Sequence, residues 1–131
     1  MLRYNQQKLK QIFKKYNIIF AYVFGSQASG KTGKMSDIDI AVYFSEQTSK
    51  QDRFDNKHKL MAEFSNFFKK EDIDVVALND SYPLLSHRIL KYGKLIYCKD
   101  IKKEKEYEDK AIGEYLDWEP SLREQMELLF V

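Results

Sequence analysis

The sequence is poor in several features that would place it in a specialised class. Its one cysteine, Cys98, excludes an internal disulfide and a cysteine zinc cluster, and suits a reducing compartment. No apolar run approaches the roughly 18 residues of a membrane span, and the first residues lack the apolar segment of a signal peptide. We therefore expect a cytoplasmic protein with no membrane association.

An excess of one charge sign is also missing. The 131 residues include 22 basic and 20 acidic side chains, for a formal net charge of +2. A duplex-binding protein normally carries a basic stripe, so we expect no direct nucleic-acid binding. The hydrophobic share of 44% and aromatic share of 15% favour a folded globule with one core. Without repeats or a linker, residues 1–131 are expected to form one domain.

Alternating helical and strand patterns predict an α/β (α+β) fold, with a small mixed sheet flanked by helices. The cluster of Phe54, Phe64, Phe67 and Phe68 is expected in the core, and Pro120 is expected to kink or restart the last helix. The predicted strands are 18–24, 37–44, 71–78 and 94–98, and the predicted helices are 4–16, 49–70, 83–92 and a C-terminal extension over about 101–131.

The most informative stretch lies between the first two predicted strands. The first strand stops at Gly25-Ser26, where backbone N–H groups and a hydroxyl can bind phosphate. A polar loop follows, and Asp37 and Asp39 then open the second strand. Because side chains alternate along a strand, both carboxylates point to one face. Mg²⁺ commonly binds one or two carboxylates together with substrate phosphates, so the stretch predicts a phosphate cradle beside a metal site.

These residues carry a resemblance to a known family. Gly25-Ser26, ten further residues and then Asp37-x-Asp39 form a signature similar to that of the DNA polymerase β-like nucleotidyltransferases. That family next places an acidic residue in an apolar strand, which matches Asp74 in Ile73-Asp-Val-Val. The small size and the pattern of residues 84–97 resemble the minimal nucleotidyltransferases (MNT proteins), and the similarity extends over nearly the whole chain.

The resemblance implies an activity and a partner. Many MNT proteins are antitoxins that transfer AMP from ATP to a tyrosine of a HEPN-domain toxin, so such a toxin is the expected partner. Two Mg²⁺ ions would be bound by Asp37, Asp39 and Asp74, while Gly25 and Ser26 would hold the triphosphate. Many relatives carry an arginine where this chain has Ser29. The implied basic ligands of the triphosphate are therefore Lys31, Lys34 or residues elsewhere.

Three alternatives remain open at this stage. The acceptor of the nucleotide could be a small molecule such as an aminoglycoside, although those enzymes usually carry an added domain. The chain could also be a non-catalytic module that binds a partner. The C-terminal segment is rich in apolar side chains, which could pack back on the domain or form a homo- or hetero-oligomer: Tyr115, Leu116, Trp118, Leu122, Met126, Leu128, Leu129 and Phe130.

Overall fold

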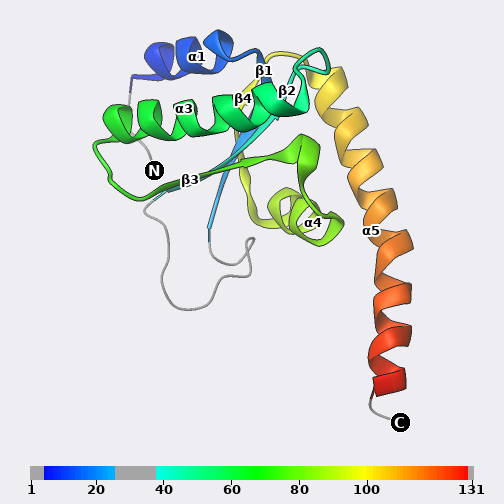
Figure 1. Cartoon of the computed structure of the whole chain (residues 1–131). Helices are drawn as coiled ribbons and strands as arrows, with labels where there is room; N and C mark the ends of the chain where they lie inside the picture. Colours follow the sequence, from blue (N-terminus) through cyan, green and yellow to red (C-terminus); the bar gives the residue numbers. More distant parts are fainter. Residues whose placement is uncertain (1–4, 26–37, 130–131) are drawn as a thin grey trace.

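The computed structural model describes residues 5–25 and 38–129, and for residues 118–129 it describes the helical backbone only. Figure 1 shows a small sheet with helices on both faces and a long C-terminal helix. The elements are, in chain order, α1 (Gln6–Lys15), β1 (Ile18–Phe24), β2 (Ile38–Phe44), α3 (Lys50–Phe68), β3 (Ile73–Ala77), a 3₁₀ turn η1 (Leu78–Asp80), α4 (Pro83–Tyr92), β4 (Lys94–Cys98) and α5 (Ile101–Leu129).

The four strands form one mixed sheet in the order β3-β2-β1-β4. β1 runs antiparallel to both β2 and β4, whereas β2 and β3 are parallel. The parallel pair needs a crossover connection, and α3 provides it. The predicted fold class, a small mixed sheet flanked by helices, is confirmed.

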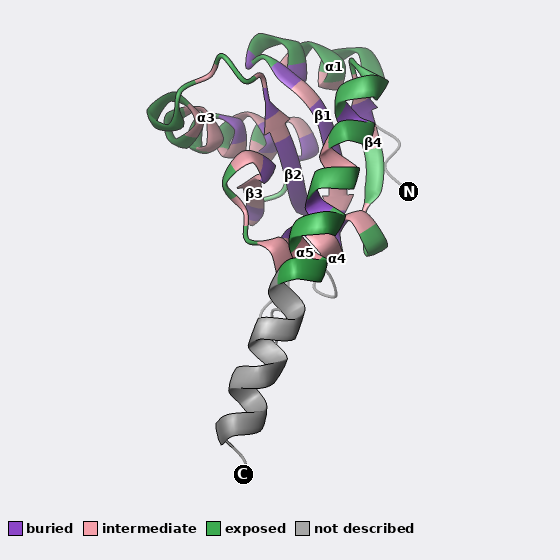
Figure 2. Ribbon diagram, turned by 90° about the vertical axis from the view of Figure 1, so that its right-hand side faces the viewer, coloured by how far each residue is buried: buried purple, intermediate pink, exposed green. Residues whose placement is uncertain are grey.

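Each face of the sheet has its own apolar core. The helices α1 and α3 cover one face through Phe13, Phe64 and Phe68, which pack on β1, β2 and β3. The helix α4 and the start of α5 cover the other face, where Phe20 and Ala41 meet Ile89 and Tyr107. The purple, buried segments in Figure 2 therefore concentrate in the strands and in the inward sides of these helices.

Local sequence signals account for the ends of the helices. The side chain of Asn5 caps α1 by accepting hydrogen bonds from the backbone N–H groups of Gln7 and Lys8. Ser49 caps α3 in the same way, accepting from Asp52. Gly93 ends α4, and a Cβ at this position would lie 2.4 Å from the carbonyl oxygen of Ile89. Glycine is thus required here by a close backbone approach.

Two predictions about the fold were wrong. Phe54 is 57% exposed rather than part of the core. At 100° per residue it lies about 80° around α3 from Phe64, at the edge of the apolar face. Of the kink or restart expected at Pro120, the restart is wrong, because α5 continues as one helix to Leu129. A proline removes one hydrogen bond from a helix, and the remaining bonds of a long helix can hold it together.

The long helix α5 begins against the sheet and then leaves it (Figure 1). The ring of Tyr115 stacks on His87 of α4, with 3.9 Å between ring centroids. Ile112 and Leu116, four residues apart on α5, are 43% and 59% exposed. No helix within the described ranges combines the length and apolarity needed to cross a membrane. The expected cytoplasmic location stays a prediction.

A buried carboxyl group fastens the start of α5 to the sheet. Glu104 is 2% exposed and accepts a hydrogen bond from the hydroxyl of Tyr22 on β1. Burial, and next the hydrogen bond with Glu108, raise the pKa of Glu104 above its ordinary value. The hydrogen bond from Tyr22 and the charge of Lys105, 3.8 Å away, lower the pKa of Glu104 to a smaller extent. The folded state therefore binds a proton that the unfolded chain releases at lower pH.

This raised pKa predicts how stability depends on pH. Between the ordinary glutamate pKa and the folded pKa of Glu104, the folded state holds more protons, so stability should fall as pH rises. Glu104→Gln should flatten this decline and stabilise the chain by roughly 1–2 kcal/mol at pH 8, the scale of a buried polar group. Urea unfolding of both proteins from pH 4 to 8 measures the difference. An equal slope in both proteins would contradict the prediction.

Candidate active site

Two of the three predicted acidic residues meet at the same end of the sheet. Asp39 is the second residue of β2 and Asp74 is the second residue of β3, and the two are paired in the parallel register. Neighbouring strands lie about 4.8 Å apart, and residues paired across them point to the same face. Strand pairing thus brings together two carboxylates that are 35 residues apart in the sequence.

The loop predicted to bind phosphate starts beside these carboxylates. Phe24, the last residue of β1, is paired with Asp39, so Gly25 follows directly next to the acidic pair. A Cβ built on Gly25 would meet nothing within 4 Å. The packing of the described chain therefore does not require glycine here, in contrast to Gly93.

The remaining predicted site residues cannot be placed. Ser26, Lys31, Lys34 and Asp37 lie outside the described residues. Where side chains are described, no group of three His, Cys, Asp or Glu residues gathers closely enough to hold a metal ion. The described part of the site thus supplies two of the three expected carboxylates, and the metal triad stays a prediction.

The residues that are placed suit a divalent cation. Asp39 is 4% exposed, so its carboxylate is held within the body of the protein beside a second carboxylate. Two adjacent carboxylates repel each other, and a nearby cation relieves that repulsion. Their ligand atoms are oxygens, which Mg²⁺ prefers. Asp39 and Asp74 therefore fit as ligands of a metal ion.

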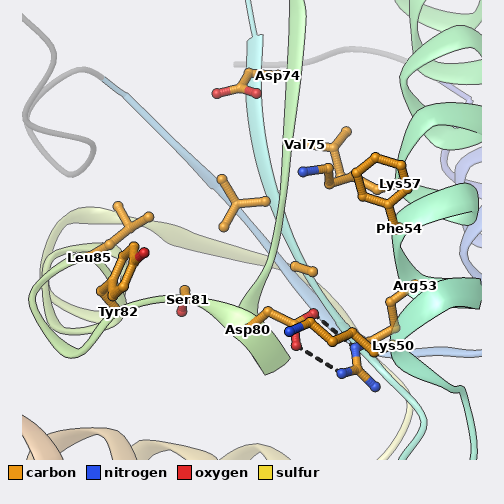
Figure 3. Close-up of a pocket in the computed structure, with 12 residues that line it drawn as sticks. Lys50, Arg53, Phe54, Lys57, Asp74, Val75, Asp80, Ser81, Tyr82 and Leu85 are labelled. Atoms are coloured by element: carbon orange, nitrogen blue, oxygen red, sulfur yellow. Dashed lines mark hydrogen bonds and ion pairs between the residues drawn. The ribbon is translucent and has the colours of Figure 1, made fainter.

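A pocket that the sequence did not predict extends from Asp74. Its volume is about 350 Å³, and Asp74, Val75, Val76 and Ala77 of β3 form one side. Figure 3 shows Phe54 and Lys57 approaching from α3, and Tyr82 and Leu85 approaching from the start of α4. The remaining lining residues are Lys50, Arg53, Asp80 and Ser81.

An ion pair closes the far end of this pocket. The guanidinium of Arg53 donates from Nε to Asp80 Oδ2 at 2.9 Å and from Nη2 to Oδ1 at 2.8 Å. It also donates to the carbonyl of Thr48 at 2.7 Å. These bonds hold the pKa of Asp80 below its ordinary value, chiefly through the hydrogen bonds from Arg53. Arg53 is therefore committed to bracing α3 against η1, and Asp74 stands at the opposite end (Figure 3).

Comparison with known proteins places the chain in a family. Residues 7–102 match the family described as Polymerase beta, Nucleotidyltransferase. The chain is also 36% identical over 85 residues to a Methanocaldococcus jannaschii protein named for protein adenylyltransferase activity, covering 65% of this chain and 86% of that protein. The chain belongs to the polymerase β nucleotidyltransferase family, and it is accordingly a nucleotidyltransferase.

Solved structures extend the similarity to the whole fold. A toxin–antitoxin complex with AMP-PNP contains a chain that matches with a TM-score of 0.69 at 21% identity, over 97% of this chain and 99% of that one. A complex of a tri-AMPylated HEPN toxin with an MNT antitoxin, from Shewanella oneidensis, matches with a TM-score of 0.68 at 19% identity and 96% coverage of both chains. At these identities the likeness shows a shared fold.

Proposed function

We propose that this protein transfers AMP from ATP to a tyrosine hydroxyl of a HEPN-type partner, as an antitoxin does. The observation that carries the proposal is the register pairing of Asp39 with Asp74, directly beside the end of β1 where the phosphate-binding loop begins. Family membership supplies the reaction class, and the protein acceptor is suggested by what the related proteins are named for. Residues 1–131 would act as one catalytic domain, with α5 as its extension.

The reaction would be an in-line displacement at the α-phosphorus of ATP. A bond forms between the tyrosine oxygen and phosphorus, the bond to the β-phosphate oxygen breaks, and pyrophosphate leaves with the electron pair. Asp74 would accept the hydroxyl proton, and Asp37 and Asp39 would share with it the binding of two Mg²⁺ ions. Those ions, when bound, neutralise charge on the entering and leaving oxygens. Gly25 and Ser26, with Lys31 or Lys34, would hold the phosphates.

The partner would be bound in part through α5. Its Ile112 and Leu116 are exposed and lie four residues apart, on one face of the helix. Large apolar side chains exposed side by side are typical of interaction surfaces. This supports a role for the exposed face of α5 in binding a partner.

The test is transfer of α-labelled ATP with Mg²⁺ to the product of the neighbouring gene, with an aminoglycoside panel in parallel. We expect label on a tyrosine of the neighbouring protein and none on the aminoglycosides, with loss of label when EDTA is added. Label on an aminoglycoside would replace this proposal with antibiotic modification. Binding of the neighbouring protein without any label on it would instead favour a non-catalytic module.

A further inference from the structure

The pocket beside Asp74 runs along the strand β3. Four consecutive residues, Asp74 to Ala77, line it, and β3 stands at the edge of the described sheet, where it pairs with β2. Edge strands and the grooves beside them are common binding places for extended peptides. The pocket also starts at the residue that would accept the hydroxyl proton. A molecule bound there would have its reactive group at Asp74 and the rest of its length along β3.

The walls of the pocket are both aromatic and exposed. Phe54 is 57% exposed and Tyr82 is 81% exposed, and they face the pocket from α3 and α4 (Figure 3). Val76, Ala77 and Leu85 add apolar surface between them. Exposed aromatic side chains at a concave site are typical anchors in protein recognition. Aromatic rings also pair favourably with another aromatic ring, so the walls suit a tyrosine.

The lining of the pocket carries a small excess of positive charge, and that excess lies on α3. Arg53 and Asp80 offset each other through their paired hydrogen bonds. Lys50 and Lys57 then add two positive charges on the α3 wall, and the carboxylate of Asp74 adds one negative charge at the other end of the pocket. The ammonium of Lys57 lies 6.0 Å from the centre of the Phe54 ring, so charge and aromatic surface are adjacent. Acidic residues near the acceptor group would be attracted to this wall, whereas a polycation such as an aminoglycoside would be repelled.

We propose that this pocket binds the acceptor as an extended, acidic peptide segment, with its tyrosine between Phe54 and Tyr82 and its hydroxyl toward Asp74. The inference rests on the proposed function for the identity of the reaction. It adds the class of acceptor, the surface that receives it, and the four residues that select it: Lys50, Phe54, Lys57 and Tyr82.

The experiment compares three fluorescein-labelled peptides of 13 residues, each with one central tyrosine flanked by glutamates, serines or lysines. Binding is measured by fluorescence anisotropy at low salt with the full chain carrying Asp39→Asn, which separates binding from transfer. The glutamate peptide should bind about tenfold more tightly than the lysine peptide, since two surface charges contribute modestly each. The double variant Lys50→Glu/Lys57→Glu should reverse that order.

Two further variants sharpen the test. Lys59→Glu is the matched control, because Lys59 is an exposed lysine of the same helix outside the pocket; it should leave the preference unchanged. Tyr82→Ala should weaken the binding of all three peptides several-fold, whatever their flanking charge. Equal binding of the three peptides, or an equal effect of Lys59→Glu and the double variant, would overturn the inference.

The outcomes also separate this inference from the proposed function. Transfer to the partner that is insensitive to Lys50→Glu/Lys57→Glu and to Tyr82→Ala would overturn the acceptor pocket and leave the proposed function standing. Charge-dependent peptide binding in this pocket, with no transfer from ATP to any tyrosine, would support the pocket and refute the proposed activity.

Discussion

Asp39→Asn should lower the rate of AMP transfer by on the order of 10³-fold, and Asp74→Asn should have a similar effect. Each change removes one charged oxygen ligand from a site whose catalytic contribution is charge neutralisation worth several kcal/mol. Asp39 is buried beside Asp74 in the strand register, so no other described carboxylate is positioned to replace it. Initial rates with α-labelled ATP and saturating partner protein measure the loss.

The matched control for this prediction is Asp72→Asn. Asp72 is two residues before Asp74 and precedes β3, where its backbone carbonyl accepts a hydrogen bond from Ile38. The transfer rate of Asp72→Asn should stay within about twofold of wild type, because Asp72 lies before β3 and is not among the expected metal ligands. A second readout is thermal: Mg²⁺ should raise the Tm of the wild type and leave that of Asp39→Asn much less affected. Full transfer by Asp39→Asn would refute its role as a metal ligand.

Phe64→Ala should lower the free energy of unfolding by about 3–5 kcal/mol, the usual cost of truncating a buried phenylalanine. Phe64 is fully buried on α3, with its ring 5.6 Å from that of Phe13 and 6.0 Å from that of Phe68. Domains of this kind are stable by only about 5–15 kcal/mol, so the loss is a large share of the total. Urea unfolding followed by circular dichroism gives the difference.

Phe54→Ala is the natural comparison, since it removes the same side chain from the same helix. Phe54 is 57% exposed, so its truncation should lower the free energy of unfolding by about 0.5 kcal/mol or less. The same change should weaken binding of the acceptor peptide. The pair separates the two roles of aromatic residues on α3. A loss of several kcal/mol from Phe54→Ala would show that this ring contributes to the core after all.

The sequence allowed much of the fold to be predicted because its signals were local. The strand of residues 18–24 was predicted at its observed limits. Strand alternation puts Ile73 and Val75 on the face opposite Asp74, and both are buried in the core on the α1 and α3 side. The first helix was predicted to end at residue 16; α1 ends at Lys15, and Asn17 adopts a left-handed φ of 57° just after it. The errors arose where a residue lay at the edge of an apolar face, as Phe54 does, or where a long helix tolerated a proline.

The candidate site could be predicted only in part, for a physical reason. Gly25 and Asp39 were recognisable because a motif of fixed spacing contains them, and strand pairing then brings Asp74 to Asp39. The pocket beside Asp74 has no such motif. Phe54 lies on α3 and Tyr82 lies directly before α4, with β3 between them in the sequence, so their approach depends on how α3 and α4 pack on the sheet. Helical spacing within either segment carries no information about that distance.

The parallel pairing of β2 with β3 also constrains how this enzyme can evolve. The register that places Asp74 beside Asp39 is the same register that buries Ile73 and Val75 against the α1 and α3 side. A slip of one residue would turn Asp74 into that apolar core and expose the two aliphatic residues. A mutation that shifts β3 and misaligns the carboxylates should therefore also unfold the protein, so selection removes it for its loss of stability. Selection for a stable chain preserves the alignment of its chemistry.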